Sequence, residues 1–223
     1  MKPLWDPETY DLARRRIVPH FDEFYGTAAA LVAELSPGGE SPRVLELGAG
    51  TGIFSEAIAR RVPGVRLELL DGSAGMLERA VFRLGKRPPL HVQAFSEALP
   101  EGSYDAVVSA IALHHLTDPE KRDLYGRIFG VLAPGGLFLN AEEIAGRSAR
   151  WEKIGVEDHH AFCRSAGCSE EEMRELAARE ANDLCAPLET QLRWLEEIGY
   201  CDVEAPWRNF RFAIFAGFRP GDA

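Results

Sequence analysis

Short apolar runs alternate with amphipathic stretches along most of the chain. Apolar runs bounded by turn residues are typical of strands buried on both faces, and amphipathic stretches between them are typical of helices that cover a sheet. The alternation predicts an α/β fold in which helices pack on both faces of a doubly wound, mostly parallel sheet. The strands are expected at residues 44–47, 66–70, 90–94, 104–109 and 137–142.

Helices are expected before the first strand and between the later ones. The N-terminal stretch has apolar residues at spacings of three to five and is interrupted by Pro19, which predicts helical structure over residues 7–36. The next helices are expected at residues 54–61, 73–84 and 119–132. The turn sequence Pro134-Gly135-Gly136 ends the last of them and leads into the fifth strand.

The chain changes character after the fifth predicted strand. Residues 147–198 show only helical patterns, and strand-like runs follow at residues 201–205 and 210–218. With Pro206-Trp207-Arg208-Asn209 as their connection, these runs predict a hairpin in which one late strand is antiparallel to the rest. We expect a single domain (1–223), divided into N-terminal helices (1–40), a ligand-binding core (41–142), a helical lid (143–198) and a C-terminal hairpin (199–223).

A glycine-rich loop follows the first predicted strand and carries the strongest chemical signal. The sequence Val44-Leu45-Glu46-Leu47-Gly48-Ala49-Gly50-Thr51-Gly52 places three alternating glycines between a strand and a helix. Glycine lets the backbone turn sharply and approach a ligand, and the helix N-terminus offers free N–H groups. An NAD-binding loop would need a glycine at Ile53. The loop therefore favours a different cofactor.

Asp71 ends the second predicted strand, nineteen residues after Gly52. A carboxylate at this position can accept hydrogen bonds from both hydroxyls of a ribose. The alternative is that Asp71 caps the helix beginning at Ser73.

Together these residues resemble the class I S-adenosylmethionine-dependent methyltransferases, and further motifs follow in the same order. Asp71-Gly72-Ser73-Ala74-Gly75-Met76-Leu77 is similar to that family's acidic ribose segment, and Ser96-Glu97-Ala98-Leu99-Pro100 to its adenine loop. Residues 104–109 resemble its fourth strand, and Leu132-Ala133-Pro134-Gly135-Gly136 its turn before the fifth. The likeness covers about residues 40–142. It implies a seven-stranded sheet with an antiparallel last strand and S-adenosylmethionine as cofactor.

The same resemblance implies the cofactor contacts. Many relatives have an Asp before the adenine loop, but this chain has Phe95 there. We expect Glu97 or the backbone around Ser96 to bind the adenine amine, while Phe95 either contacts the cofactor or is part of the core. Tyr10 and one of Arg14 to Arg16 are expected near the methionine end. The predicted cofactor-binding residues are Tyr10, Glu46, Gly48, Ala49, Gly50, Gly52, Asp71, Gly72, Ser73, Met76, Phe95, Ser96, Glu97 and Ser109.

Acceptor contacts are expected from side chains that follow the fourth and fifth strands, because ligands of such sheets bind at the switch point. His115 and His114 follow the fourth strand. Histidine titrates near neutral pH, so we predict His115 as the catalytic base with His114 as the fallback, unless both only shape the pocket. Glu142 and Glu143 follow the fifth strand and could bind a cationic acceptor or face solvent.

Charge and composition limit the partners. Lys plus Arg number 25 against 35 Asp plus Glu, which gives a formal charge of −10 and argues against a nucleic-acid substrate. The chain has no apolar run of membrane-spanning length and no apolar stretch of signal-peptide type, so we expect a cytoplasmic protein. His159, His160 and Cys163 match no standard ligand spacing, so no metal ion is expected.

Three functional classes follow. Methyl transfer to a small-molecule acceptor is favoured. Two segments, Arg14-Arg15-Arg16-Ile17-Val18-Pro19-His20-Phe21 and Ile111-Ala112-Leu113-His114-His115-Leu116, are similar to relatives of the carboxy-S-adenosylmethionine synthases of tRNA modification. This likeness keeps an RNA-modification enzyme or a modified-cofactor enzyme as an alternative. A noncatalytic, cofactor-binding regulatory protein is the third, and an oligomer is compatible with all of them.

Overall fold

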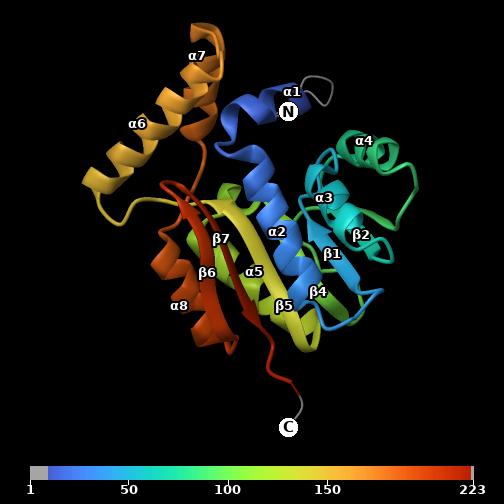
Figure 1. The fold of residues 1–223 in the computed structure, drawn as a ribbon. Coiled ribbons are helices and arrows are strands. Elements are labelled where there is room, and N and C mark those ends of the chain that lie inside the picture. Colours follow the sequence, from blue (N-terminus) through green and yellow to red (C-terminus); the bar gives the residue numbers. More distant parts are fainter. Residues whose placement is uncertain (1–9, 222–223) are drawn as a thin grey trace.

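The computed structural model describes residues 10–221 and is built around a seven-stranded sheet of order β3-β2-β1-β4-β5-β7-β6 (Figure 1). Strands β1 to β5 are parallel, β7 is antiparallel to β5, and β6 is antiparallel to β7. The doubly wound, mostly parallel sheet with an antiparallel last strand is thus confirmed. The strands are β1 Arg43–Leu47, β2 Arg66–Asp71, β3 Leu90–Val92, β4 Tyr104–Ala110, β5 Leu132–Glu143, β6 Cys201–Asn209 and β7 Phe212–Phe218.

Helices cover both faces of the sheet. One hydrophobic core joins the sheet to α2, α3 and α4, and a second joins it to α5 and α8. The helices are α1 Tyr10–Ile17, α2 Phe21–Leu35, α3 Ile53–Arg61, α4 Ala74–Leu84, the 3₁₀ turn η1 Leu113–His115, α5 Asp118–Val131, α6 Ala149–Ser165, α7 Glu170–Glu180 and α8 Leu188–Ile198. Within residues 10–221, no helix has both the length and the apolar composition needed to cross a membrane.

Local sequence explains where most helices begin and end. The predicted break at Pro19 is confirmed, since α1 ends at Ile17 and α2 begins at Phe21; residues 7–9 of the predicted helix lie outside the described residues. The hydroxyl of Ser73 accepts the Met76 N–H at the start of α4. Such a cap satisfies one of the N–H groups that a helix terminus leaves unpaired.

The predicted boundaries of the last hairpin were wrong. Pro206-Trp207-Arg208-Asn209 lie inside β6, and the turn falls at Phe210 and Arg211, where Phe210 has a φ of 44°. Because β6 is an edge strand with β7 as its one neighbour, a proline can occupy it without breaking a ladder on both sides. The third strand also ends at Val92, earlier than the predicted residue 94.

The segment predicted as a lid divides into two parts. Helices α6 and α7 extend beyond the sheet at the end where α1 lies (Figure 1), and α6 contacts α1. Helix α8 packs instead on α5 and β6. The lid, which stays a prediction, is therefore reduced to α6 and α7.

Candidate functional site

A cavity of about 700 Å³ lies where the carboxyl ends of β1, β2 and β4 meet α1. The order of the sheet reverses between β1 and β4, which makes this position the topological switch point of the fold. The residues that line the cavity are Tyr10, Arg14, Gly48, Gly50, Asp71, Gly72, Ser73, Met76, Phe95, Ile111, Ala112, His115 and Asn182.

The glycine loop between β1 and α3 forms the floor of the cavity. The N–H groups of Gly48 and Ala49 both donate to the carbonyl of Leu70, at 2.8 and 3.1 Å, which ties the loop to β2. Gly48 has a φ of 69°, and a Cβ there would lie 2.3 Å from the Cβ of Ala112. Glycine is therefore required on both conformational and steric grounds, and the backbone stays open to a ligand.

Asp71 joins the loop to the start of α4. One carboxylate oxygen accepts the Gly50 N–H at 2.9 Å, and the other accepts the Ser73 N–H at 2.8 Å. Burial raises the pKa of Asp71, although these two backbone donors oppose the shift. A carboxylate oxygen can accept more than one hydrogen bond. Asp71 can thus hold the loop and still receive hydroxyl groups from the cavity.

The predicted adenine loop presents its aromatic residue to the cavity. Phe95 lines the cavity, whereas Ser96 and Glu97 are exposed and do not. Glu97 folds back, and its carboxylate accepts the Ala94 N–H at 2.7 Å. The guanidinium of Arg127 donates to the carbonyls of Phe95 and Glu97, at 2.6 and 2.9 Å. This arginine fixes the loop from α5.

The other predicted cofactor residues lie behind the cavity wall. Glu46 is buried under the loop and accepts the Ser55 hydroxyl, and burial raises the pKa of Glu46 to about 8 although that hydroxyl opposes the shift. The Ser109 hydroxyl donates to the carbonyl of Leu47 at 2.9 Å. A Cβ on Gly52 would lie 2.9 Å from that of Ala80, so this glycine permits α3 and α4 to pack. Ala49 likewise does not line the cavity.

His114 is buried and fixed by Glu142 at the end of β5. The His114 Nδ1 lies 2.6 Å from one Glu142 oxygen, and the other oxygen accepts the N–H groups of Leu113 and His114 at 2.8 and 3.1 Å. Burial would lower the pKa of His114, but the Glu142 carboxylate raises it above its usual value. Glu142 is therefore not available to an acceptor.

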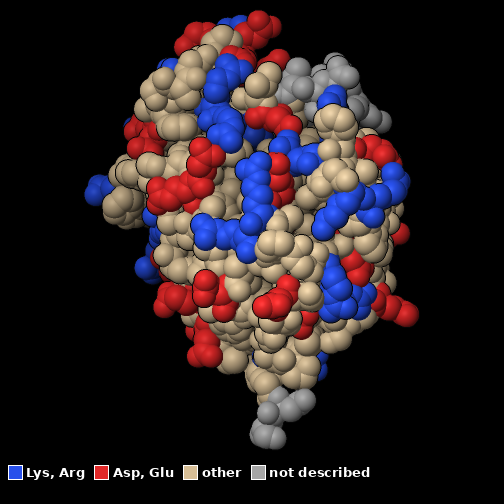
Figure 2. Space-filling view, turned by 45° about the vertical axis from the view of Figure 1, so that its right-hand side comes forward, with Lys and Arg blue, Asp and Glu red and all other residues tan. Residues whose placement is uncertain are grey.

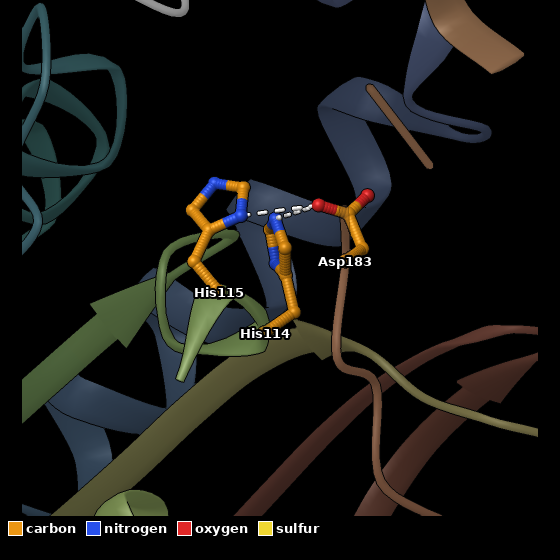
Figure 3. A group of neighbouring side chains, drawn as sticks. All are labelled: His114, His115 and Asp183. Atoms are coloured by element: carbon orange, nitrogen blue, oxygen red, sulfur yellow. Dashed lines mark ion pairs between the residues drawn. The ribbon is translucent and has the colours of Figure 1, made fainter. Parts of the chain in front are cut away.

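His115 is the histidine that reaches the cavity. Its side chain is 40% exposed, and its Nδ1 lies 3.0 Å from an oxygen of Asp183. Asp183 comes from the connection between α7 and α8 and lies beside both histidines (Figure 3). Burial would raise the pKa of Asp183, but the hydrogen bond from His115 lowers it.

A strained backbone corner lies between β4 and these histidines. Ile111 lines the cavity and has a φ of 49°, which a β-branched residue rarely adopts. Its N–H donates to the carbonyl of Ala141 at 2.8 Å. This bond to β5 holds the corner that turns the chain toward His115.

A second histidine pair links the lid helices to the sheet. The His159 ring lies 2.7 Å from the carbonyl of Ile17 through Nε2 and 3.1 Å from Glu180 through Nδ1. His160 and Arg211 also contact Glu180, at 2.7 and 2.9 Å. We call these four residues, His159, His160, Glu180 and Arg211, the latch. They connect α6 and α7 to the turn before β7.

Asn182 and Asp183 were missed by sequence reasoning. They lie in the connection between α7 and α8, where no periodic pattern or motif marks them. Only the folded chain brings them beside residues that follow β4.

Comparison with known proteins relates part of the chain to methyltransferases. A family model described as a methyltransferase domain matches residues 44–136. An uncharacterized methyltransferase of Mycobacterium tuberculosis is 39% identical over 95 residues, which are 42% of this chain and 46% of that protein. The chain therefore spans about half the length of this relative.

Two further proteins resemble the chain over more of its length. A carboxy-S-adenosyl-L-methionine synthase of Trichodesmium erythraeum is 26% identical over 184 residues, 79% of this chain and 72% of that protein. The solved structure of phosphoethanolamine N-methyltransferase 2 of Haemonchus contortus, in complex with S-adenosyl-L-methionine, has a TM-score of 0.69 at 16% identity. It covers 98% of this chain and 58% of the other, and it shares the fold.

Proposed function

We propose that this chain, which belongs to the class I S-adenosylmethionine-dependent methyltransferases, binds S-adenosylmethionine in the cavity and transfers its methyl group to a small-molecule acceptor. One observation carries the proposal. The glycine loop, the Asp71 carboxylate and the Phe95 ring, which lie on three separate segments, all line one cavity at the switch point.

Each part of the cofactor has a matching group in the cavity. The ribose hydroxyls bind Asp71, the adenine packs on Phe95, and the methionine end lies near Tyr10 and the buried Arg14. Ile111 and His115 would form the acceptor side of the site.

The reaction is an in-line displacement. A lone pair of the acceptor forms a bond to the methyl carbon while the bond between that carbon and the sulfonium sulfur breaks, and S-adenosylhomocysteine leaves. The protein contributes chiefly by holding the two reactants in line. We assign His115 the catalytic role at the acceptor side, because it reaches the cavity whereas His114 is buried against Glu142.

The size of the cavity and the surface charge support a small acceptor. A volume of about 700 Å³ is in the range of pockets that hold small ligands. On the face shown in Figure 2, Lys and Arg side chains are mixed with Asp and Glu instead of forming one basic field. Nucleic-acid substrates are normally bound by such a field.

A second candidate is an enzyme that makes or uses a carboxylated form of the cofactor. The 26% identity to a carboxy-S-adenosyl-L-methionine synthase extends over 79% of this chain, which favours it. Arg14 in the cavity wall carries a positive charge that can pair with the added carboxylate of such a cofactor. Mass spectrometry of the cofactor that copurifies with the protein separates the two: an unmodified cofactor supports simple methyl transfer, and a carboxylated one supports the second candidate.

Calorimetric titration with S-adenosylhomocysteine tests the proposed site. We expect micromolar binding by the parent and no measurable binding by Gly48→Ala, because the new Cβ would collide with Ala112 beneath the ligand. The matched control is Gly126→Ala on α5, where a Cβ meets no atom within 4 Å. A folded parent that does not bind, or a Gly48→Ala protein that binds like the parent, would contradict the proposal.

A further inference from the structure

Three side chains direct one ligand atom each toward a common point at the edge of the cavity (Figure 3). The atoms are Nε2 of His114, Nδ1 of His115 and a carboxylate oxygen of Asp183, and all lie within 4.8 Å of one another. The Asp183 oxygen is 3.0 Å from His115 Nδ1 and 3.7 Å from His114 Nε2.

Two of the three separations can be compared with the coordination sphere of a metal ion. Nitrogen and oxygen ligands bind zinc and similar ions at about 2.0–2.2 Å, so neighbouring donors around one ion lie about 3.0–3.5 Å apart. The two distances to Asp183 are close to this range. The two ring nitrogens lie within 4.8 Å of each other.

The Glu142 carboxylate orients the His114 ring in the way that a carboxylate orients a metal-bound histidine. A metal-bound histidine usually donates its other ring N–H to a carboxylate, which fixes the ring and its tautomer. Glu142 lies 2.6 Å from His114 Nδ1, and its carboxylate accepts four backbone N–H groups, those of Ala112, Leu113, His114 and Glu143. With Nδ1 held by Glu142, Nε2 is the ring nitrogen that faces Asp183, at 3.7 Å.

The cluster is also open on one side. His115 is 40% exposed and lines the cavity, whereas His114 and Asp183 are 5% and 10% exposed. Structural metal sites are closed by protein ligands, while catalytic sites keep positions free for water or substrate. Three protein ligands beside a cavity match the second type.

We propose that His114, His115 and Asp183 bind one divalent transition-metal ion, whose free positions face the cavity and take an oxygen of the acceptor. Two imidazoles and one carboxylate suit ions such as Zn²⁺, Mn²⁺, Fe²⁺ and Co²⁺. This inference rests on the proposed methyl transfer and adds an acceptor class to it: molecules with a hydroxyl or carboxyl oxygen.

The ion changes the assigned role of His115. Coordination lowers the pKa of a bound hydroxyl, so its proton leaves to water. The oxygen then forms the bond to the methyl carbon as the carbon–sulfur bond breaks. His115 acts here through the ion and not as the base predicted from sequence. The expectation of no metal ion rested on His159, His160 and Cys163 and stays untested; Asp183, which completes the cluster proposed here, comes from a distant segment.

Metal binding can be measured without knowing the acceptor. Metal-free protein is titrated with Zn²⁺ by calorimetry and with Co²⁺ by visible absorption, and we expect one ion per chain with micromolar affinity or better. His115→Ala and Asp183→Asn should weaken binding by at least tenfold, and Glu142→Gln by about 10–100-fold. Circular dichroism checks that each variant is folded. The control His20→Asn removes an exposed histidine and keeps a residue that tolerates its φ of 52°. It should bind the ions like the parent.

Binding of S-adenosylhomocysteine is measured on the same samples, so that two failures can be told apart. A parent that binds S-adenosylhomocysteine but neither ion overturns the metal site and leaves the proposed function intact. A parent that does not bind S-adenosylhomocysteine contradicts the proposed function itself. Equal affinity for Co²⁺ in the parent and in folded His115→Ala also overturns the metal site.

Discussion

Asp71 has two tasks at the scale of single residues, because it holds the glycine loop and lines the cavity. Asp71→Ala removes both, and hydrogen bonds to charged groups each contribute about 1.5–3 kcal/mol, so S-adenosylhomocysteine should bind at least tenfold more weakly. Asp71→Asn keeps one acceptor oxygen and should lie between the alanine variant and the parent. Calorimetry measures this series. If the alanine variant binds like the parent, another residue contacts the ribose.

Glu46 should make stability depend on pH. Its pKa of about 8 lies above the usual value of 4.5, so the folded state holds a proton that the unfolded state releases between these pH values. Stability contributed by this group is therefore lost as pH rises from about 4.5 to about 8. Glu46→Gln removes the proton-linked change. The Tm of Glu46→Gln minus the Tm of the parent should increase as pH rises across this range and should level off above it. A Tm difference that stays constant with pH would contradict the raised pKa.

Sequence reasoning worked where chemistry is local. Gly48, Gly50 and Asp71 could be placed at the cavity from their spacing within one strand–loop–helix unit, while their cofactor contacts stay a prediction. Glu97 and Ser109 were placed in the right segments, but rotation of a side chain away from a cavity leaves no mark in the sequence. Asp183 could not be found, since its proximity to His115 exists only after folding.

At the scale of elements, we expect the latch to stabilise α6 and α7. Glu180 contacts two histidines and Arg211 while 13% exposed, and Glu180→Gln would leave those side chains without their carboxylate. Breaking a buried pair costs about 3–5 kcal/mol. We expect faster hydrogen exchange in α6 and α7 and a lower Tm. Glu175→Gln, an exposed position on the same helix, is the matched control. Parent-like exchange in both variants would show that the latch does not hold these helices.

The pH dependence of the latch has two limits. Burial would lower the pKa of His159, but its contacts with Cys163 and within the latch raise that pKa to about 10. Burial would raise the pKa of Glu180, but its contacts with the two histidines lower it to about 2. The His159 contribution is complete below its unfolded value of about 6.5 and is lost as pH rises through about 10. The Glu180 contribution is complete above its unfolded value of about 4.5 and is lost as pH falls through about 2. Exchange in α6 and α7 should be slowest between about pH 4.5 and 6.5, after correction for intrinsic rates. A minimum outside this window would contradict the assignment.

Element boundaries were predicted well where the chain itself sets them and poorly where a neighbour does. The break at Pro19 and the start of the helix expected at Ser73, where Ser73 caps α4 at Ala74, are set locally and match the structure. The extension of β6 through Pro206 depends on its position at the sheet edge, beside β7. Position within a sheet is a tertiary property, so turn chemistry alone gave the wrong connection.

Ligand binding should stabilise the whole molecule, because the cavity joins α1 to the ends of three strands. S-adenosylhomocysteine at one hundred times its Kd should add about 2.7 kcal/mol to the free energy of unfolding. For a chain of this length that corresponds to a rise in Tm of about 5–10 °C. Scanning fluorimetry measures it. NAD at the same concentration is the control, and an equal shift with NAD would contradict the assigned cofactor.

Glu180 and Asp183 lie three positions apart at the end of α7, yet they belong to the latch and to the histidine cluster respectively. One short segment thus serves both. If α6 and α7 swing open as the predicted lid, the carboxylate beside His114 and His115 is displaced in the same movement. Closure of α6 and α7 would then set the timing of catalysis. While the molecule is open and exchanges its ligands, the histidine cluster lacks its carboxylate. The bound sulfonium would therefore be protected from attack by water until an acceptor has been enclosed.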